Sequence, residues 1–111
     1  MDNKKDNAYY IRKIVTDLRF LIAHTQELTR ENMEEDEVLS DCIMFRLVQI
    51  SENSVRLTEE FKRRYSEIPW MAIKGLRNRI VHEYGEVDLS IVYDTVKNDV
   101  PFLLERLEYL I

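Results

Sequence analysis

The sequence predicts an all-α protein, an antiparallel bundle of four to five helices. Only two Gly and two Pro occur in 111 residues, so few tight turns are available. Apolar residues recur at three- and four-residue steps over long stretches, and no stretch shows the alternation of a strand. Hydrophobic residues make up 45% and charged residues 33%, which is typical of a folded globular chain. We therefore expect a single helical domain over residues 1–111.

The first helix is expected from about Ala8 to Arg30. Its apolar side chains fall on one face of such a helix, and they are Ile11, Ile14, Val15, Leu18, Leu21, Ile22 and Leu28. The acidic segment 31–37 interrupts this pattern, and we expect it to connect the first helix to the second.

The second helix is expected from about Val38 to Tyr65. Six of the seven residues from Cys42 to Val48 are apolar, which is more than one buried face requires. Something must cover the additional apolar surface. Two arrangements fit equally well: a second copy of the chain packs there, or the helix is central and is packed on two sides within one bundle.

The third helix is expected to hold Pro69 in its first turn, where the missing N–H is not needed, and to extend to Tyr84. Its apolar face carries Trp70, Ile73, Leu76, Ile80 and Val81. Gly75, inside this helix, would permit another helix to approach closely. Gly85 is expected to end the helix in a left-handed conformation.

The fourth helix is expected to begin after Asp88, whose carboxylate would cap its first turn. Pro101 is expected to kink or split this helix, because proline lacks an N–H and its ring clashes with the preceding turn. The apolar residues from Phe102 to Leu110 would complete the bundle.

The charges are unevenly distributed along the chain. The net charge of -5 argues against a protein that binds nucleic acid over its whole surface. Residues 31–41 hold six acids and no base, whereas residues 56–82 hold seven bases and three acids. A basic patch on an acidic protein can attract a polyanion to one place. The alternative is that solvated helix faces simply alternate in sign.

The sequence also predicts the compartment. Cys42 is the single cysteine, which excludes an intramolecular disulfide and suits a reducing compartment. No apolar run follows the first residues, so no signal peptide is expected. No stretch approaches the roughly 20 apolar residues that a membrane-spanning helix needs. We therefore expect a cytoplasmic protein without a membrane partner.

The segment from Arg77 to Tyr84 carries the residues best suited to chemistry. Arginine binds phosphate through a fork of N–H donors, and histidine transfers protons near neutral pH. Asn78 and His82 are four residues apart and share a helical face, and Arg77 and Tyr84 lie nearly above one another. This geometry permits all four side chains to line one rim.

Cleavage of RNA is the reaction that these side chains fit best. One histidine without a nearby cysteine or carboxylate cluster does not make a metal site, so we expect no metal and no cofactor. RNA carries its own nucleophile, the 2′-hydroxyl, so the protein needs to supply only proton transfer and a cation. His82 would transfer the proton, Arg77 would stabilise the phosphorane, and Asn78 would orient His82 or bind a phosphate oxygen. Since acid and base usually require two groups, a symmetric homodimer with paired motifs is expected.

The wider pattern resembles the HEPN superfamily, in particular the HepT-like toxins. The strings that carry the resemblance are IPW at 68–70, GLRNRIVHEY at 75–84 and VDL at 87–89. The family's mark is an Arg, a polar residue after it, and a His four to six residues further on. This branch adds a Tyr two residues after the His. Arg77, Asn78, His82 and Tyr84 match it, whereas Gly85 and Glu86 stand where many relatives would have an aromatic residue.

The resemblance implies a HEPN-like fold and a metal-independent ribonuclease that acts as the toxin of a toxin–antitoxin pair. It implies a dimer whose motifs face one cleft. It also implies a cognate MNT-type nucleotidyltransferase antitoxin that silences the toxin by transferring AMP to the motif tyrosine, here Tyr84. A phosphodiester there would bring negative charge and bulk into a cleft that receives RNA.

Two other functions remain compatible with the sequence. The chain could be a non-catalytic HEPN module that binds a nucleotidyltransferase or presents substrate to it. It could also be a structural helical dimer whose Arg77 and His82 are buried and paired.

Overall fold

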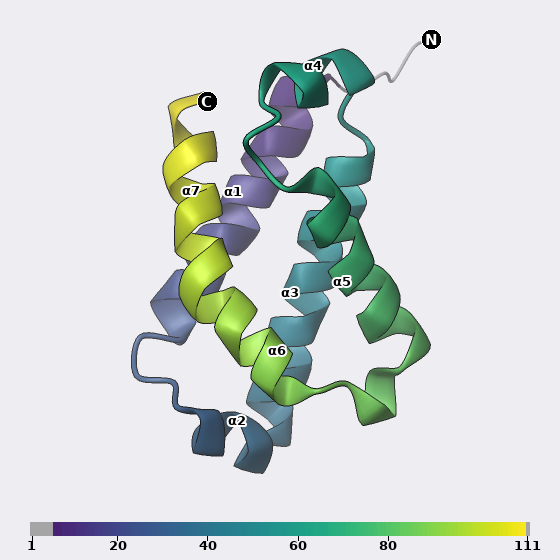
Figure 1. The fold of residues 1–111 in the computed structure, drawn as a ribbon. Coiled ribbons are helices and arrows are strands. Elements are labelled where there is room, and N and C mark those ends of the chain that lie inside the picture. The colour runs from purple at the N-terminus through teal and green to yellow at the C-terminus, as the bar shows by residue number, and fades with distance from the viewer. Residues whose placement is uncertain (1–5, 111) are drawn as a thin grey trace, which may run out of the picture.

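The computed structural model describes residues 6–110, which form helices and turns and no strand. Three long helices are α1 (Asn7–His24), α3 (Glu37–Val55) and α5 (Trp70–His82). A fourth rod consists of α6 (Leu89–Asp94), a π-helical turn (Thr95–Asp99) and α7 (Val100–Leu107). Two short helices, α2 (Arg30–Glu35) and α4 (Glu59–Arg64), lie at opposite ends (Figure 1). The prediction of an all-α bundle is confirmed.

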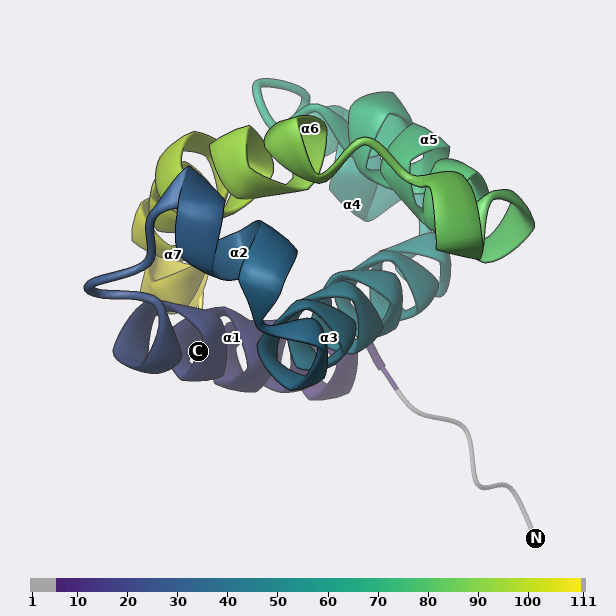
Figure 2. The ribbon, with the colours of Figure 1, turned by 90° about the horizontal axis from the view of Figure 1, so that it is seen from below.

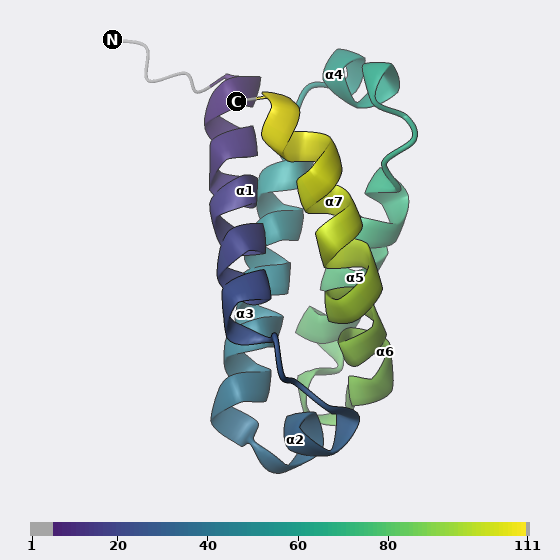
Figure 3. The same cartoon turned by 90° about the vertical axis from the view of Figure 1, so that its left-hand side faces the viewer.

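Successive rods run in alternate directions, which makes the bundle antiparallel (Figures 1 and 3). α1 packs along α3 on one side and along α7 on the other, and α3 packs along α5. Seen from below, the rods surround a common interior (Figure 2). Leu18 and Leu21 of α1 and Val92 of α6 are completely buried there. The bundle is elongated, at 45 × 28 × 27 Å.

The first helix is shorter than its apolar pattern predicts. α1 ends at His24, and the carbonyl of Thr25 instead accepts hydrogen bonds from the Leu28 N–H and from Lys97 Nζ at 3.2 and 2.7 Å. Leu28 is buried although it lies outside a helix, so the apolar pattern extends beyond the end of the helical backbone. The segment 31–37 is not a plain connection. Thr29 caps α2 through a capping box with Asn32.

The second helix is likewise divided. α3 ends at Val55, and α4 starts after Thr58, whose hydroxyl accepts the Phe61 N–H. Asn7 fixes this break from the start of α1: its carbonyl oxygen accepts the Thr58 N–H and its amide donates to the Thr58 hydroxyl, both at 3.1 Å. Leu57 is buried within the break. The predicted continuous helix from 38 to 65 is therefore wrong.

Both glycine predictions are also wrong. No glycine among the described residues has a positive φ, and α5 ends at His82 rather than at Tyr84. No atom of another element lies within 4 Å of where a Cβ on Gly75 would stand, so no helix approaches there. Pro69 precedes α5 at the N-cap position, just outside the first turn where it was predicted. Its missing N–H costs nothing in either place.

The fourth helix follows the prediction more closely. The Asp88 carboxylate accepts the Ser90 N–H and caps α6. Pro101 lies in the first turn of α7 and follows the π-helical turn directly. Because Pro101 has no N–H to donate to the preceding turn, the wider π turn accommodates it without ending the rod. The rod is thus altered by Pro101 but remains continuous.

An apolar hollow separates α5 from the fourth rod. It measures about 390 Å³ and is lined by Ile73, Gly75 and Leu76 of α5 and by residues of α6 and α7. Asp99 lies at its border, where burial and, secondarily, the charge of Asp94 raise the pKa of its carboxyl group. α5 is therefore held mainly along one side, by α3.

α3 is packed on two sides within the bundle, as one of the two explanations of its apolar surplus predicts. It packs on two sides, against α1 and α5, and Ile43, Met44 and Leu47 are buried. Phe45 nevertheless remains 59% exposed. Apolar surface is thus left over even with both sides packed. No helix of the described part of the chain is long and apolar enough to cross a membrane.

Candidate active site

The helix α5 presents the motif to solvent because the apolar residues that it packs against the bundle lie on its other side. Ile80 is 2% exposed, and Ile73 and Leu76 are half-buried on the same side. Asn78 and His82 lie on the opposite, exposed side, one helical turn apart. The prediction that these two share a face is consistent with this arrangement.

Arg77 reaches sideways from α5 to α3. Its Nε and Nη2 donate to Oε2 of Glu52 at 3.1 and 2.8 Å, and its Nη1 donates to Oδ1 of Asn78 at 3.1 Å. An arginine has five N–H donors, so two remain without a partner among the described residues. The side chain is 31% exposed. The guanidinium is thus fixed in place and still able to receive an anion.

His82 is the last residue of α5, and its imidazole is exposed without a hydrogen-bond partner among residues 6–110. Neither of its ring nitrogens is therefore committed to another side chain. His24, the other histidine, is also exposed and packs on Phe20 with 4.3 Å between ring centroids. Of the two histidines, only His82 lies on the helix that carries Arg77.

Tyr84 lies beyond the end of α5, in the 3-10 turn η1 (Tyr84–Glu86). Its ring is half exposed, and its hydroxyl donates a hydrogen bond to Oδ1 of Asp41 in the second turn of α3. This hydrogen bond raises the pKa of Tyr84, and desolvation and the negative charges of Asp41 and Glu37 raise it further. The phenol therefore keeps its proton at neutral pH.

A shallow apolar hollow of about 370 Å³ lies between the motif and α3. Phe45 and Val81, which are 59% and 47% exposed, line it together with Tyr84.

The four residues predicted from the sequence are thus only partly brought together. Arg77 is hydrogen-bonded to Asn78, His82 lies one turn further along α5, and Tyr84 packs separately against α3. Within the single chain, Arg77 is paired with Glu52 but partly exposed, and His82 is exposed.

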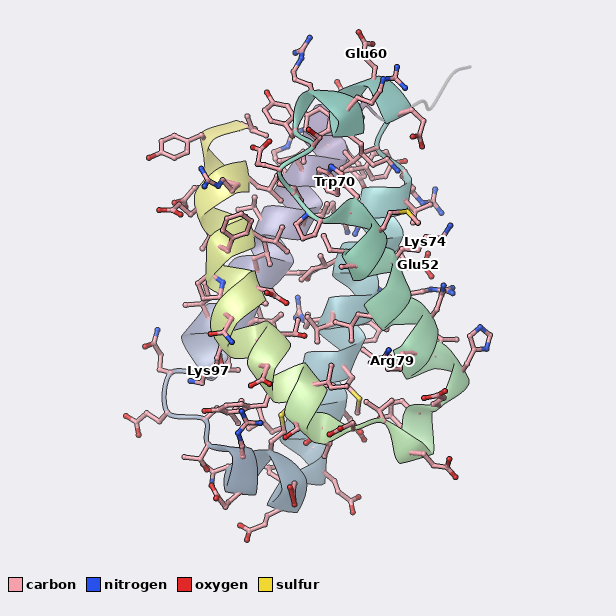
Figure 4. The ribbon with its side chains drawn as sticks, in the orientation of Figure 1. Glu52, Glu60, Trp70, Lys74, Arg79 and Lys97 are labelled. Atoms are coloured by element: carbon pink, nitrogen blue, oxygen red, sulfur yellow. The ribbon has the colours of Figure 1, made fainter. Side chains whose placement is uncertain are left out.

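Two carboxylates of the site were missed by sequence reasoning. Glu52 is 25 residues from Arg77, and Asp41 is 43 residues from Tyr84. Their charge was the only signal available, and Asp41 was one acid among the six in residues 31–41. Figure 4 shows Glu52 and Lys74 projecting from the same edge of the molecule, with Arg79 on the inner side of α5.

The described residues contain no group of three His, Cys, Asp or Glu side chains that could hold a metal ion. Cys42 is a free, half-buried thiol on α3.

Comparison with known proteins identifies the family. The family model "Ribonuclease HepT-like" matches residues 14–110. A "Putative RNase" of Caldanaerobacter subterraneus subsp. tengcongensis is 28% identical over 92% of this chain and 91% of its own length. A "Probable ribonuclease HepT" of Thermococcus cleftensis is 29% identical over 96% of this chain and 97% of its own length.

A third relative is longer than this chain. It is a "Gamma-glutamylcyclotransferase and putative RNase" of Methanocaldococcus jannaschii, 28% identical over 94% of this chain, which spans 47% of that protein's length. No solved structure matches significantly. The family model covers nearly all of the helical bundle and the whole motif segment, so the chain belongs to the HepT-like ribonuclease family.

Proposed function

We propose that this protein is a metal-independent endoribonuclease that cleaves RNA with Arg77 and His82. The observation that carries the proposal is the environment of the Arg77 guanidinium. Glu52 and Asn78 hold it in place, and two of its N–H donors have no partner among residues 6–110. The exposed imidazole of His82 lies on the same helix. Membership of the HepT-like ribonuclease family supports this reaction over other phosphate chemistry.

The reaction uses the 2′-hydroxyl of the substrate as nucleophile. An imidazole takes the proton of that hydroxyl, the 2′-oxygen bonds to phosphorus, and the bond from phosphorus to the 5′-oxygen breaks. The products are a 2′,3′-cyclic phosphate and a 5′-hydroxyl, whose proton comes from a second acid. The open N–H donors of Arg77 bind the non-bridging oxygens as their charge grows.

We further propose that two copies of the chain form the complete site. Each copy offers one motif histidine, whereas the reaction needs a base and an acid. The exposed apolar side chains of Phe45 and Val81 border the motif, and a second copy would cover them. The paired motifs would then supply two imidazoles and two guanidinium groups to one cleft.

We propose that modification of Tyr84 inactivates the ribonuclease. A cognate MNT-type nucleotidyltransferase, as antitoxin, would transfer AMP from ATP to the Tyr84 hydroxyl. The phenolic oxygen bonds to the α-phosphorus and pyrophosphate leaves. Asp41 accepts the hydrogen bond of that hydroxyl and is placed to receive its proton. The protein would act in the cytoplasm, where RNA and ATP are both present.

The test is RNA cleavage by wild-type protein beside the variants Arg77→Ala and His82→Ala. We expect each variant to lose about 100- to 1,000-fold in rate. His24→Ala is the matched control, since it removes the other exposed histidine, and it should cleave like wild type. Light scattering on the same samples should show a dimer.

Two outcomes would overturn this proposal. Equal cleavage by wild type and His82→Ala would exclude the motif as the active site. Absence of cleavage by a wild-type protein whose mass shows an unmodified Tyr84 would exclude the activity. If that protein still bound a nucleotidyltransferase, it would be the non-catalytic binding module.

A further inference from the structure

Most of the basic residues that the sequence concentrates in residues 56–82 lie at one end of the bundle, whereas Arg77 and Arg79 lie further along α5. α4 and the start of α5 lie at that end, and α2 and the start of α3 lie at the other (Figure 1). The acids at the opposite end are Glu31, Glu34, Glu35, Asp36, Glu37 and Asp41. The bundle is therefore electrically polarised along its length, and the motif extends from α5 to the acidic end, where Tyr84 donates a hydrogen bond to Asp41.

A hollow of about 570 Å³ lies at the basic end, between α4 and the first turns of α5. Lys62, Arg63 and Lys74 line it, with Glu59 as the single carboxylate among its lining residues. Glu59 lies 3.6 Å from Lys62, whereas Arg63 and Lys74 have no ionic partner among the described residues. Three cations against one carboxylate leave the hollow positively charged.

The hollow also offers apolar surface. Trp70 lines it, and its indole Nε1 donates to the carbonyls of Lys62 and Tyr65 at 3.2 Å, which fixes the ring. Met71 lines the hollow as well and is 82% exposed. Proteins that bind single-stranded nucleic acid combine basic groups with fixed aromatic rings. The phosphates bind to the cations, and the bases pack on the apolar surface.

The exposed face of α5 connects this hollow to the motif. Lys74, Asn78 and His82 are all exposed and lie one helical turn apart on this face, so successive side chains are about 6 Å apart along the axis. Figure 4 shows Trp70 above Lys74 on the same helix, with Glu60 of α4 higher still. A strand can follow this face continuously from His82 to the hollow.

We propose that this face is the path of the substrate: single-stranded RNA runs from the Arg77–His82 site over Lys74 into the hollow under α4, where Arg63 binds its phosphates. The inference rests on the proposed ribonuclease function and adds a direction to it. The opposite end of the bundle repels phosphate through its carboxylates. The strand therefore leaves the site toward α4.

The test uses the binding of a fluorescent single-stranded RNA to protein that carries His82→Ala, so that cleavage does not enter the measurement. In this background, Arg63→Gln and Lys74→Gln are combined. We expect the dissociation constant to rise about tenfold and the slope of log affinity against log salt to fall by about 1.4, or about 0.7 for each lost phosphate contact on a single strand.

The matched control combines Arg19→Gln and Arg106→Gln, which remove the same charge from exposed positions on α1 and α7. Its affinity should stay within about twofold of its parent, because these positions lie off the path. Thermal melts of both double variants establish that they remain folded.

Two results would overturn the path. Equal loss in both double variants would mean that RNA responds only to overall charge. No loss in the Arg63/Lys74 variant would mean that the hollow serves something else, such as an acidic protein surface. Failure of the ribonuclease proposal would be seen separately, by comparing RNA cleavage by the wild-type protein with cleavage by His82→Ala.

Discussion

The helix α3 makes an arginine–carboxylate pair on each of its two packed sides, and the two pairs differ in what surrounds them. Toward α1, Arg46 Nη1 lies 2.7 Å from Asp17 Oδ1. Toward α5, Arg77 Nη2 lies 2.8 Å from Glu52 Oε2. The carboxylate side chain is 11% exposed in the first pair and 46% exposed in the second.

We interpret the first pair as one that stabilises the fold and the second as one that positions Arg77, a proposed catalytic side chain. The Arg46 guanidinium lies 3.8 Å from the centroid of the Phe20 ring, so an aromatic face covers it. No aromatic ring of the described residues covers Arg77, whose other hydrogen-bond partner besides Glu52 is the amide oxygen of Asn78. Water and phosphate can reach the second pair, and its strength is correspondingly screened.

Breaking the α1–α3 pair should have the largest effect on stability. Arg46→Ala leaves the nearly buried Asp17 without its partner, and we expect a loss of about 2 kcal/mol in the free energy of unfolding. The melting temperature should fall by about 10 °C, as measured by calorimetry. Arg19→Ala is the control, because its pair with Glu108 is exposed and 3.5 Å long. Equal losses in the two variants would contradict the comparison.

Breaking the α3–α5 pair should instead change RNA binding. Glu52→Gln removes the negative charge from beside Arg77, and we expect about fivefold tighter binding, near 1 kcal/mol, in the His82→Ala background. The free energy of unfolding should change by less than about 1 kcal/mol. Asp17→Asn, the matched change at the other pair, should reduce stability and leave RNA affinity unaltered. Weaker binding by Glu52→Gln would show that the charge of Glu52 is needed to position Arg77.

The smallest effect is expected at Tyr84, the third contact to α3. Asp41→Asn should lower the pKa of Tyr84 toward its ordinary value, because the carboxylate both accepts its hydrogen bond and repels the phenolate. Since the folded pKa is raised, the contact stabilises the fold at neutral pH and is lost as pH rises through that pKa. NMR titration of labelled tyrosines measures the shift. Glu34→Gln, which removes an acid of α2, is the control, and an equal shift there would contradict the assignment to Asp41.

The helix ends show which parts of the fold could be predicted from the sequence. Apolar periodicity reports burial but not helix ends. Leu28 is buried as the pattern of the first helix predicts, and Leu57 is buried within the predicted second helix, but each lies where the helix has already ended. The breaks depend on hydrogen bonds from distant residues, such as Asn7 to Thr58 and Lys97 to Thr25. Such contacts leave no mark in a periodic pattern.

The residues of the candidate site also fall into those that the sequence could predict and those that it could not. The residues on α5 were predictable, because their spacing and the family resemblance lie within one continuous segment. Glu52 and Asp41 were not, because α3 packs beside α5 only after the chain has folded back on itself. The basic residues were visible as a cluster in the sequence, but the convergence of Lys62, Arg63 and Lys74 on one hollow depends on how α4 packs against α5.

The apolar hollow beside α5 has a consequence for how the molecule moves. α5 buries its apolar face mainly against α3, whereas α1 is enclosed by both α3 and α7. Local opening of a helix costs less where fewer buried contacts must be broken. We therefore expect α5 to separate from the bundle more readily than α1 does. The proposed catalytic side chains thus stand on the long helix whose release requires the least disruption of the core.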